Sequence, residues 1–276
     1  MKGLVLTAIA GWAAAHLASA GSGPEGARTS LAAHRGGSLL WPENSLLAFR
    51  NAVALGSDYL EADVHLSSDG EVVVIHDPTL ERTTTGRGPV RASSRAELGE
   101  LSLKDLSGAV TAERVPLLAD VAALAAAARR RLLVEIKVDA QGQRYPEIEE
   151  RVLVVLENQG VAFDAVVMAF EPETWRRVRA LRPDITAGAL FSRGTLRATG
   201  ATPDRALEDA ARAGVGMVGF HHALIDQGLV ASARRAGIAL AAWTVNDSDA
   251  LRRVIELGVG IVITDRPDLA RPLLAR

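Results

Sequence analysis

Short apolar runs alternate with longer amphipathic runs along most of the chain, and this alternation constrains the fold more than any other feature. The amphipathic runs include SLLAFRNAVALG, DRALEDAARAG and DSDALRRVIELG, which open with Ser or Asp and close with Gly. Ser and Asp cap helix starts, and glycine accepts the left-handed conformation at helix ends. Strands that alternate with capped helices indicate parallel β-α units.

The apolar runs predict the strands of this fold. They are LAAH (31–34), YLEADVHL (59–66), EVVVIHD (71–77), RLLVEIKV (131–138), AVVMAF (165–170), ITAGALF (185–191), GMVGFH (216–221), ALAAWTV (239–245) and GIVITD (260–265). When the runs at 59–66 and 71–77 are both placed in the second strand region, the chain holds the eight units of an α/β, (β/α)8 TIM barrel over residues 30–276. A doubly wound open sheet is the alternative, but the even strand spacing up to the last helix favours the barrel.

One segment interrupts the alternation. Residues 78–116 are polar, rich in Gly, Arg, Ser and Thr, and contain only short helical patterns such as RAELGELSL. A structureless loop of this length is uncommon inside a domain. We therefore expect a small functional insertion over one end of the barrel, after the second strand region.

The N-terminal segment MKGLVLTAIAGWAAAHLASA has one cation at Lys2, an apolar run and an A-x-A sequence at residues 18–20. This order predicts a signal peptide over residues 1–20 and therefore a periplasmic or secreted protein. If the segment is not a signal, the protein is expected in the cytoplasm. The run is too short and too rich in alanine for a stable membrane span, which needs ~20 strongly apolar residues.

Composition excludes several classes of function. The formal net charge of -2 gives no support to nucleic-acid binding or to a polybasic membrane patch. The chain has no cysteine, which excludes disulfides, a thiol nucleophile and thiolate metal sites. Any metal ion must therefore be bound by histidine or carboxylate ligands. The oligomeric state does not follow from the sequence.

Charged residues interrupt two predicted strands. Glu61 and Asp63 share one face of YLEADVHL, and Glu135 and Lys137 share one face of LLVEIKV. The interior of such a barrel is apolar except near the carboxyl ends of its strands, where active sites lie. Structural ion pairs at the rim are the alternative for each strand alone. Three carboxylates in one pocket cannot all ionise without a cation, and oxygen ligands favour Ca2+ or Mg2+. We predict that Glu61, Asp63 and Glu135 bind a divalent ion.

Two histidines, His34 in AHRG and His76 in VIHD, lie at strand ends that face the predicted barrel rim. Imidazole titrates near neutral pH, so the pair could supply a general acid and a general base. A hydrogen-bonded structural role is the alternative for each of them. His65 lies on the same strand face as two of the carboxylates, and we expect it to support the site. No role follows from the sequence for His221 or His222.

The basic residues contain a further signal. Only three of the 31 are lysines, so Lys137 next to Glu135 indicates that a compact ammonium is required there. Together with Arg35, it could polarise a phosphoryl group and stabilise negative charge during transfer. The two glycines after Arg35 would let a phosphate approach the backbone closely. Trp243 ends the seventh predicted strand and, like Phe170, either forms an apolar wall for the substrate or packs on the core.

Several of these motifs, read in order, resemble one known family. AHRGGSLLWPENSLLAFRNAVALGSDYLEADVHLSSDGEVVVIHDPTLERTTTGRGPV resembles the N-terminal signature of the glycerophosphodiester phosphodiesterase family. VEIK, MAFEPETW, AWTVN and GIVITDRPD resemble its later strand-end motifs in the same order. The resemblance runs from about Leu31 to Arg271, and it implies a TIM barrel with a small insertion after the HD strand.

The resemblance also implies roles for individual residues. Glu43 and Asn44 match a motif that supports the site, and Ser45 stands where the family usually has threonine, a change that should preserve the helix cap. His34 and His76 match the family's acid and base. Glu61, Asp63 and Glu135 match the carboxylates that hold its divalent ion. Arg35 and Lys137 match the cations that contact the phosphate.

The implied reaction begins with attack of a glycerol hydroxyl, activated by the metal, on phosphorus. A histidine protonates the departing alcohol, and water then opens the cyclic phosphate to give glycerol phosphate. The implied substrates are small glycerophosphodiesters such as glycerophosphocholine and glycerophosphoethanolamine. One alternative is phospholipase D-like activity on lysophospholipids, which would require an exposed apolar rim. The other is a non-catalytic phosphodiester-binding barrel, which would normally lack a histidine or a metal carboxylate.

Overall fold

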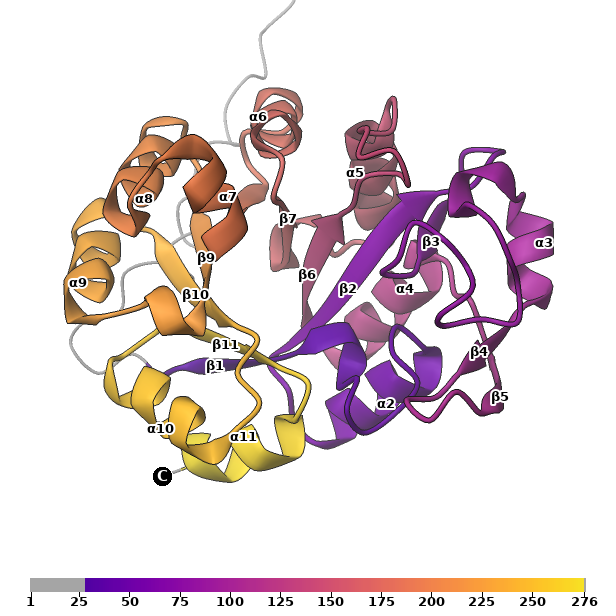
Figure 1. The fold of residues 1–276 in the computed structure, drawn as a ribbon, viewed down its shortest axis with the longest axis horizontal. Helices are drawn as coiled ribbons and strands as arrows, with labels where there is room; N and C mark the ends of the chain where they lie inside the picture. Colours follow the sequence, from indigo (N-terminus) through magenta and orange to yellow (C-terminus); the bar gives the residue numbers. More distant parts are fainter. Residues whose placement is uncertain (1–27, 276) are drawn as a thin grey trace, which may run out of the picture.

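The main sheet closes on itself in the computed structural model, which describes residues 28–275 (Figure 1). Its parallel strands follow the order β1-β11-β10-β9-β8-β7-β6-β2, and β1 also pairs with β2, which closes the barrel. The predicted TIM barrel is confirmed. The predicted signal peptide, residues 1–20, lies outside the described residues and stays a prediction. The barrel strands are β1 (Ser30–Ala33), β2 (Tyr59–Leu66), β6 (Arg131–Ile136), β7 (Ala165–Ala169), β8 (Thr186–Phe191), β9 (Met217–His221), β10 (Ala239–Trp243) and β11 (Ile261–Thr264).

The helices begin at capping residues of the kind that the sequence indicates. The side chains of Ser45, Asp226 and Asp247 each accept a hydrogen bond from a backbone N–H in the first turn of the following helix. Within residues 28–275, none of the helices combines the length and the apolar character needed to cross a bilayer. The helices around the barrel are α2 (Leu46–Ala54), α4 (Leu118–Ala128), α5 (Ile148–Asn158), α6 (Pro172–Leu181), α7 (Arg193–Thr199), α8 (Pro203–Arg212), α9 (Gln227–Ala236), α10 (Ser248–Glu256) and α11 (Pro267–Leu274).

Two cores lie on either side of the barrel wall. The larger one fills the space between strands and helices, and the smaller one fills the barrel itself, where Tyr59, Leu133 and Met168 pack together. Side chains two residues apart on a strand share a face. Because Tyr59 points inward, Glu61 and Asp63 also point inward, toward the carboxyl end of β2.

The apolar run at 71–77 does not continue the parallel barrel. It forms β3 (Val72–Val74), which folds back antiparallel to β2 through a tight turn where Gly70 has φ 83°. Residues 78–116 then form a small subdomain that Figure 1 shows at the right, beside β2. It consists of η2 (Val90–Ala92), α3 (Arg95–Glu100) and the hairpin of β4 (Ser102–Lys104) and β5 (Val110–Arg114). It has a core of its own, which contains Leu80, Val90, Leu98 and Leu103.

Candidate active site

Three carboxylates meet inside the mouth of the barrel. Ligand oxygens of Glu61, Asp63 and Glu135 all lie within 4.8 Å of one another, and all three residues are buried. β2 pairs with β6 so that Asp63 lies beside Glu135, which explains why two adjacent strands place their acids together. Among the described residues, Glu61 Oε1 and Asp63 Oδ1 are buried and accept no hydrogen bond. Buried polar atoms are nearly always satisfied, so this trio has the chemistry of an oxygen-ligand cation site.

The environment pushes the pKa values of two of these acids in opposite directions. Burial and the neighbouring Asp63 raise the pKa of Glu61 to about 8. Burial also favours the neutral form of Asp63, but Lys137, Arg35 and two histidines hold its pKa well below its usual range. At neutral pH one carboxylate therefore carries a proton while its neighbour is ionised.

Two cations lie against the trio, as the sequence predicts. Lys137 Nζ donates to Glu135 Oε1 at 2.5 Å and lies 3.3 Å from Asp63 Oδ1. Arg35 Nε lies 3.3 Å from Asp63 Oδ2. Burial lowers the pKa of Lys137, but the carboxylates of Glu135 and Asp63 outweigh it and hold the pKa above its usual value. Both cations are therefore charged and stand where a phosphoryl oxygen could reach them.

His34 is held by a carboxylate from the far end of the chain. Its Nδ1 lies 2.6 Å from Asp265 Oδ1, and Asn246 and Ser38 also donate to Asp265. Burial favours neutral Asp265, but these hydrogen bonds lower its pKa to about 2. Because an ionised carboxylate only accepts, Nδ1 carries the proton and Nε2 is free to exchange one. That Nε2 lies 4.0 Å from Glu61 Oε2.

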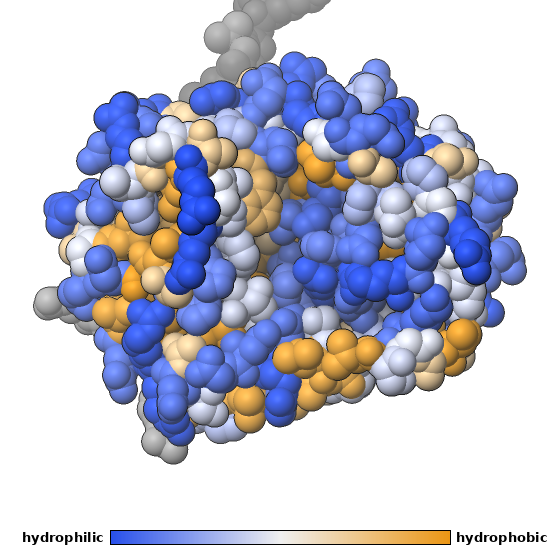
Figure 2. All heavy atoms as spheres, in the orientation of Figure 1, coloured by the Kyte–Doolittle hydropathy of each residue, from blue (hydrophilic) through white to orange (hydrophobic). Residues whose placement is uncertain are grey.

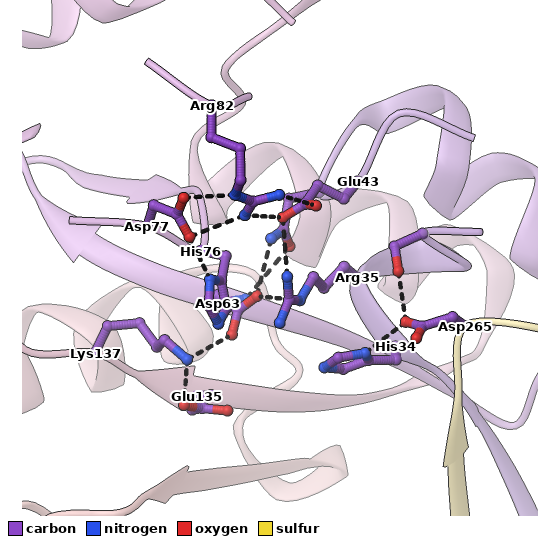
Figure 3. A network of polar contacts seen from close by, with 12 residues as sticks. His34, Arg35, Glu43, Asp63, His76, Asp77, Arg82, Glu135, Lys137 and Asp265 are labelled. Carbon is purple, nitrogen blue, oxygen red and sulfur yellow. Dashed lines mark hydrogen bonds and ion pairs between the residues drawn. The ribbon is translucent and has the colours of Figure 1, made fainter. Parts of the chain in front are cut away.

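His76 reaches the same site through the antiparallel return of β3. The backbone N–H of Ile75 donates to Asp63 O, which brings the following residue back to the level of the acidic trio. His76 Nδ1 lies 2.7 Å from Asp77 Oδ1, and this hydrogen bond lowers the pKa of Asp77 well below its usual range. Both imidazoles are close enough to lower the pKa of Asp63. Figure 3 shows the two histidines on either side of Arg35 and Asp63.

The HRGG turn after β1 is held in an unusual backbone conformation. Arg35 has φ 51°, and its backbone N–H donates to Glu61 Oε2 at 2.8 Å. Gly36 has φ 80°, and a Cβ there would lie 2.7 Å from Ala48 Cβ in α2. The structure thus gives Gly36 a buried packing role against α2, and the expectation that the two glycines let a phosphate approach the backbone stays a prediction. Asn44, which is also in the left-handed region, donates from Nδ2 to Asp63 Oδ2 at 2.9 Å.

His65 lies behind the site and supports it, in agreement with the expectation. Its Nδ1 lies 2.8 Å from the Tyr145 hydroxyl, and its Nε2 lies 3.0 Å from the backbone oxygen of His76. Burial lowers the pKa of His65 to about 4, so the ring is neutral. A carbonyl only accepts, so Nε2 carries the proton and fixes the backbone at His76.

Aromatic rings line the opposite side of the mouth. The Trp243 ring contacts Phe170 edge-on, with ring centroids 5.4 Å apart, and His221 at 5.8 Å. His221 stacks on His222 at 4.7 Å. Figure 2 shows a recess on this face with hydrophilic atoms on its right wall and hydrophobic atoms on its left. Trp243 ends β10 and Phe170 directly follows β7, so both lie at the carboxyl ends of barrel strands, and the predicted apolar wall for the substrate stays a prediction.

Three acidic and basic partners of the site do not follow from the sequence reasoning. Asp77 directly follows His76, and Asp265 ends the GIVITD strand, so strand-end position was an available signal for both. Arg82 bridges Asp77 and Glu43. It lies in an arginine-rich chain, where one more arginine carries no signal.

Known proteins agree with this architecture. Residues 34–269 match the model of the Glycerophosphoryl diester phosphodiesterase family. The glycerophosphodiester phosphodiesterase of Caldanaerobacter subterraneus subsp. tengcongensis is 32% identical over 242 residues, which cover 87% of this chain and 96% of that protein. The enzyme of the same description from Bacillus altitudinis is 32% identical over 250 residues, with 88% and 96% covered.

A solved structure supports both fold and activity. It is an Oleispira antarctica phosphodiesterase in complex with its product sn-glycerol-3-phosphate, 25% identical with a TM-score of 0.76, and the match covers 90% of this chain and 98% of that chain. Together with the barrel and the acidic trio at its mouth, these matches show that the chain is an enzyme of the glycerophosphoryl diester phosphodiesterase family.

Proposed function

We propose that the enzyme hydrolyses small glycerophosphodiesters to glycerol 3-phosphate and an alcohol, with His34 and His76 as acid and base and a divalent ion at the acidic trio. The observation that carries this proposal is that His34, which follows β1, and His76, which follows the return of β3, lie on either side of Arg35 and Asp63 (Figure 3). Two proton-exchanging imidazoles with a cation between them suit a displacement at phosphorus.

The trio fits a hard cation, and Ca2+ or Mg2+ is the expected occupant. Buried Glu61 Oε1 and Asp63 Oδ1 accept no hydrogen bond among the described residues, and such oxygens are the ligands these ions prefer. When bound, the ion would supply Lewis-acid polarisation and a centre of positive charge. Glu61, Asp63 and Glu135 would hold it.

The chain's own groups would then move the protons. Each imidazole has Nδ1–H fixed by a carboxylate, Asp265 or Asp77, so each presents Nε2 to the substrate. One Nε2 would accept the proton of the attacking hydroxyl, and the other would donate a proton to the departing alcohol. Arg35 and Lys137 would stabilise the extra negative charge on the phosphoryl oxygens.

The charges of the inner site suit a phosphodiester. Three carboxylates face two cations, Arg35 and Lys137, and Glu61 holds a proton at neutral pH because its pKa is raised to about 8. The formal charge of this set is then zero. A divalent ion that displaces the proton would change the charge to plus one, which complements the single negative charge of a phosphodiester.

The apolar wall of Trp243 and Phe170 would pack against the carbon atoms of the substrate. Lysophospholipids are a poorer fit, because docking on a bilayer requires a continuous apolar rim. The insertion does expose two apolar side chains, Leu106 at 73% and Val110 at 60%. Both lie at the single hairpin of β4 and β5, and one pair of exposed apolar side chains is too small to form such a rim.

A coupled assay for glycerol 3-phosphate tests the proposed function. Glycerophosphocholine, glycerophosphoethanolamine and glycerophosphoglycerol should each release it in the presence of Ca2+ or Mg2+, and lysophosphatidylcholine should be turned over far more slowly. Release of choline and lysophosphatidate from the lysolipid at comparable rates would favour the phospholipase D-like alternative. A protein that binds these diesters without turnover would instead be the non-catalytic barrel.

The raised pKa of Glu61 predicts how stability depends on pH. The folded, metal-free protein holds this proton up to about pH 8, whereas the unfolded chain loses it near its ordinary value of 4.5. The stabilisation is therefore fully present below about pH 4.5, declines while only the unfolded chain ionises, and is lost once the pH has risen through about 8. In chelator, Tm should fall between pH 6 and 9, and the rise in Tm on adding metal should be larger at pH 9.

Glu61→Gln is the matched control for this measurement. It removes the titrating group and a ligand, so the variant should show a flatter Tm profile in chelator and a smaller rise with metal. Parallel profiles for the variant and the wild type would show that Glu61 does not carry this proton.

A further inference from the structure

Arg82 lies in the insertion, outside the barrel, and connects two carboxylates at the edge of the site. Its Nε and Nη2 donate to Asp77 at 2.6 and 2.9 Å, and its Nη1 and Nη2 donate to Glu43 at 2.7 and 2.9 Å. Four hydrogen bonds from one guanidinium occupy most of its five N–H groups. Figure 3 shows the guanidinium between the two acids.

Each of the two carboxylates holds one group of the candidate site. Asp77 Oδ1 accepts from His76 Nδ1 at 2.7 Å, and Glu43 Oε1 accepts from Arg35 Nη1 at 3.0 Å. Burial favours neutral Glu43, but Arg82 and Arg35 lower its pKa, so the carboxylate is ionised. Without Arg82, two negative groups would face each other, and each could rotate away from its partner.

The geometry distinguishes this contact from an ordinary surface ion pair. Exposed pairs contribute little when two flexible side chains meet at one point, and Arg82 is 49% exposed. Here, however, a planar guanidinium binds two carboxylates at once with a fork that lysine cannot reproduce. Because most of its donors are already occupied, Arg82 is also poorly placed to bind the phosphate itself.

We propose that Arg82 is a positioning residue, which joins Glu43 and Asp77 so that Arg35 and His76 are held in one geometry at the phosphoryl site. The insertion is thereby part of the catalytic apparatus, although none of its side chains touches the acidic trio in this role. The inference rests on the proposed two-histidine function. Partners of this outer kind typically change activity by about 10- to 100-fold when they are replaced.

The test compares Arg82→Met and Arg82→Lys with Arg87→Met, a matched change at an exposed arginine of the same insertion. Arg82→Met should lower kcat by about 10- to 100-fold and raise KM, since it releases both His76 and Arg35. Arg82→Lys keeps the charge but not the fork and should recover only part of kcat. Arg87→Met should behave as the wild type. Binding of Ca2+ or Mg2+ should change little, because Arg82 does not contact the trio.

A double-mutant cycle with Asp77→Asn separates positioning from general damage to the fold. If Arg82 acts through Asp77, adding Arg82→Met to Asp77→Asn should cost much less kcat than the same change in the wild type. Methylguanidinium in the buffer should restore part of the activity of Arg82→Gly. Additive losses in the cycle, or wild-type kcat in Arg82→Lys and Arg82→Met, would overturn the proposal.

The two proposals can fail separately. Full activity in His76→Ala would remove the two-histidine function and, with it, the basis for a role of Arg82. An inactive His76→Ala variant alongside fully active Arg82 variants would reject only the positioning role. Should Arg82→Met lose thermal stability, Arg82→Lys decides the question, since it keeps both the charge and the aliphatic stem.

Discussion

Replacing His34 or His76 with alanine should lower kcat for glycerol 3-phosphate release by about 10²- to 10⁴-fold, the range that positioned acids and bases contribute. Each imidazole has Nδ1 within 2.7 Å of a carboxylate, which leaves Nε2 to exchange a proton. Either change removes one of the two proton transfers. The kcat of the double variant should be only slightly below that of the less active single variant, because the two groups act in one reaction.

His222→Ala is the matched control for these variants. His222 lies on the aromatic side of the mouth, stacked on His221, and its side chain contacts neither the acidic trio nor the two cations. This control should keep wild-type kcat. Circular dichroism should be unchanged in all three proteins, whereas Tm should fall in His34→Ala, because this change removes a hydrogen bond from the buried carboxylate of Asp265. If His34→Ala and His76→Ala turned over substrate at the wild-type rate, the acid and base would have to be sought elsewhere.

The sequence predicts the acidic trio well because strand periodicity is local. YLEADVHL and LLVEIKV each place their charges on one face, and neighbouring parallel strands share the edge where those charges end. The register of β2 against β6 then brings Asp63 beside Glu135. Only the alternation of residues and the order of the strands are needed for this inference, and both can be read from the chain.

The partners of the histidines are harder to predict because they depend on closure of the barrel. Asp265 is 231 residues from His34 along the chain, and the two meet only because β11 pairs with β1. His76 depends on a different event, the reversal at Gly70 that makes β3 antiparallel. An apolar run such as EVVVIHD is compatible with either direction, so the sequence places His76 at a rim but does not show how it arrives there.

The role of Gly36 shows a similar limit. A glycine beside a cation suggests space for a ligand. However, a glycine can also be required because a nearby helix leaves no room for a side chain. Here a Cβ on Gly36 would lie only 2.7 Å from the Cβ of Ala48 in α2, which is too close for any residue other than glycine. The turn packs closely against α2, the helix that follows it in the same β-α unit, and the sequence does not show how closely the two approach.

Removal of divalent metal should abolish activity, and addition of Ca2+ or Mg2+ should restore it. The expectation follows from the buried trio, in which Glu61 Oε1 and Asp63 Oδ1 accept no hydrogen bond among the described residues. Without the ion, Lys137 is bound to Glu135 and Asp63, and the inner site is formally neutral. It then attracts a phosphodiester less strongly and lacks the polarisation that such a displacement requires.

Glu135→Gln and a chelator titration make this expectation quantitative. The variant keeps the shape of the side chain but removes one charged ligand, so it should need a much higher metal concentration for half-maximal activity, with kcat at saturation lowered as well. Separate titrations with Ca2+ and Mg2+ identify the better occupant, since Ca2+ tolerates irregular oxygen geometry and Mg2+ requires a near-octahedral arrangement. Undiminished turnover by chelated protein, shown to be metal-free by elemental analysis, would mean that Arg35 and Lys137 alone stabilise the phosphoryl charge and that the trio has another purpose.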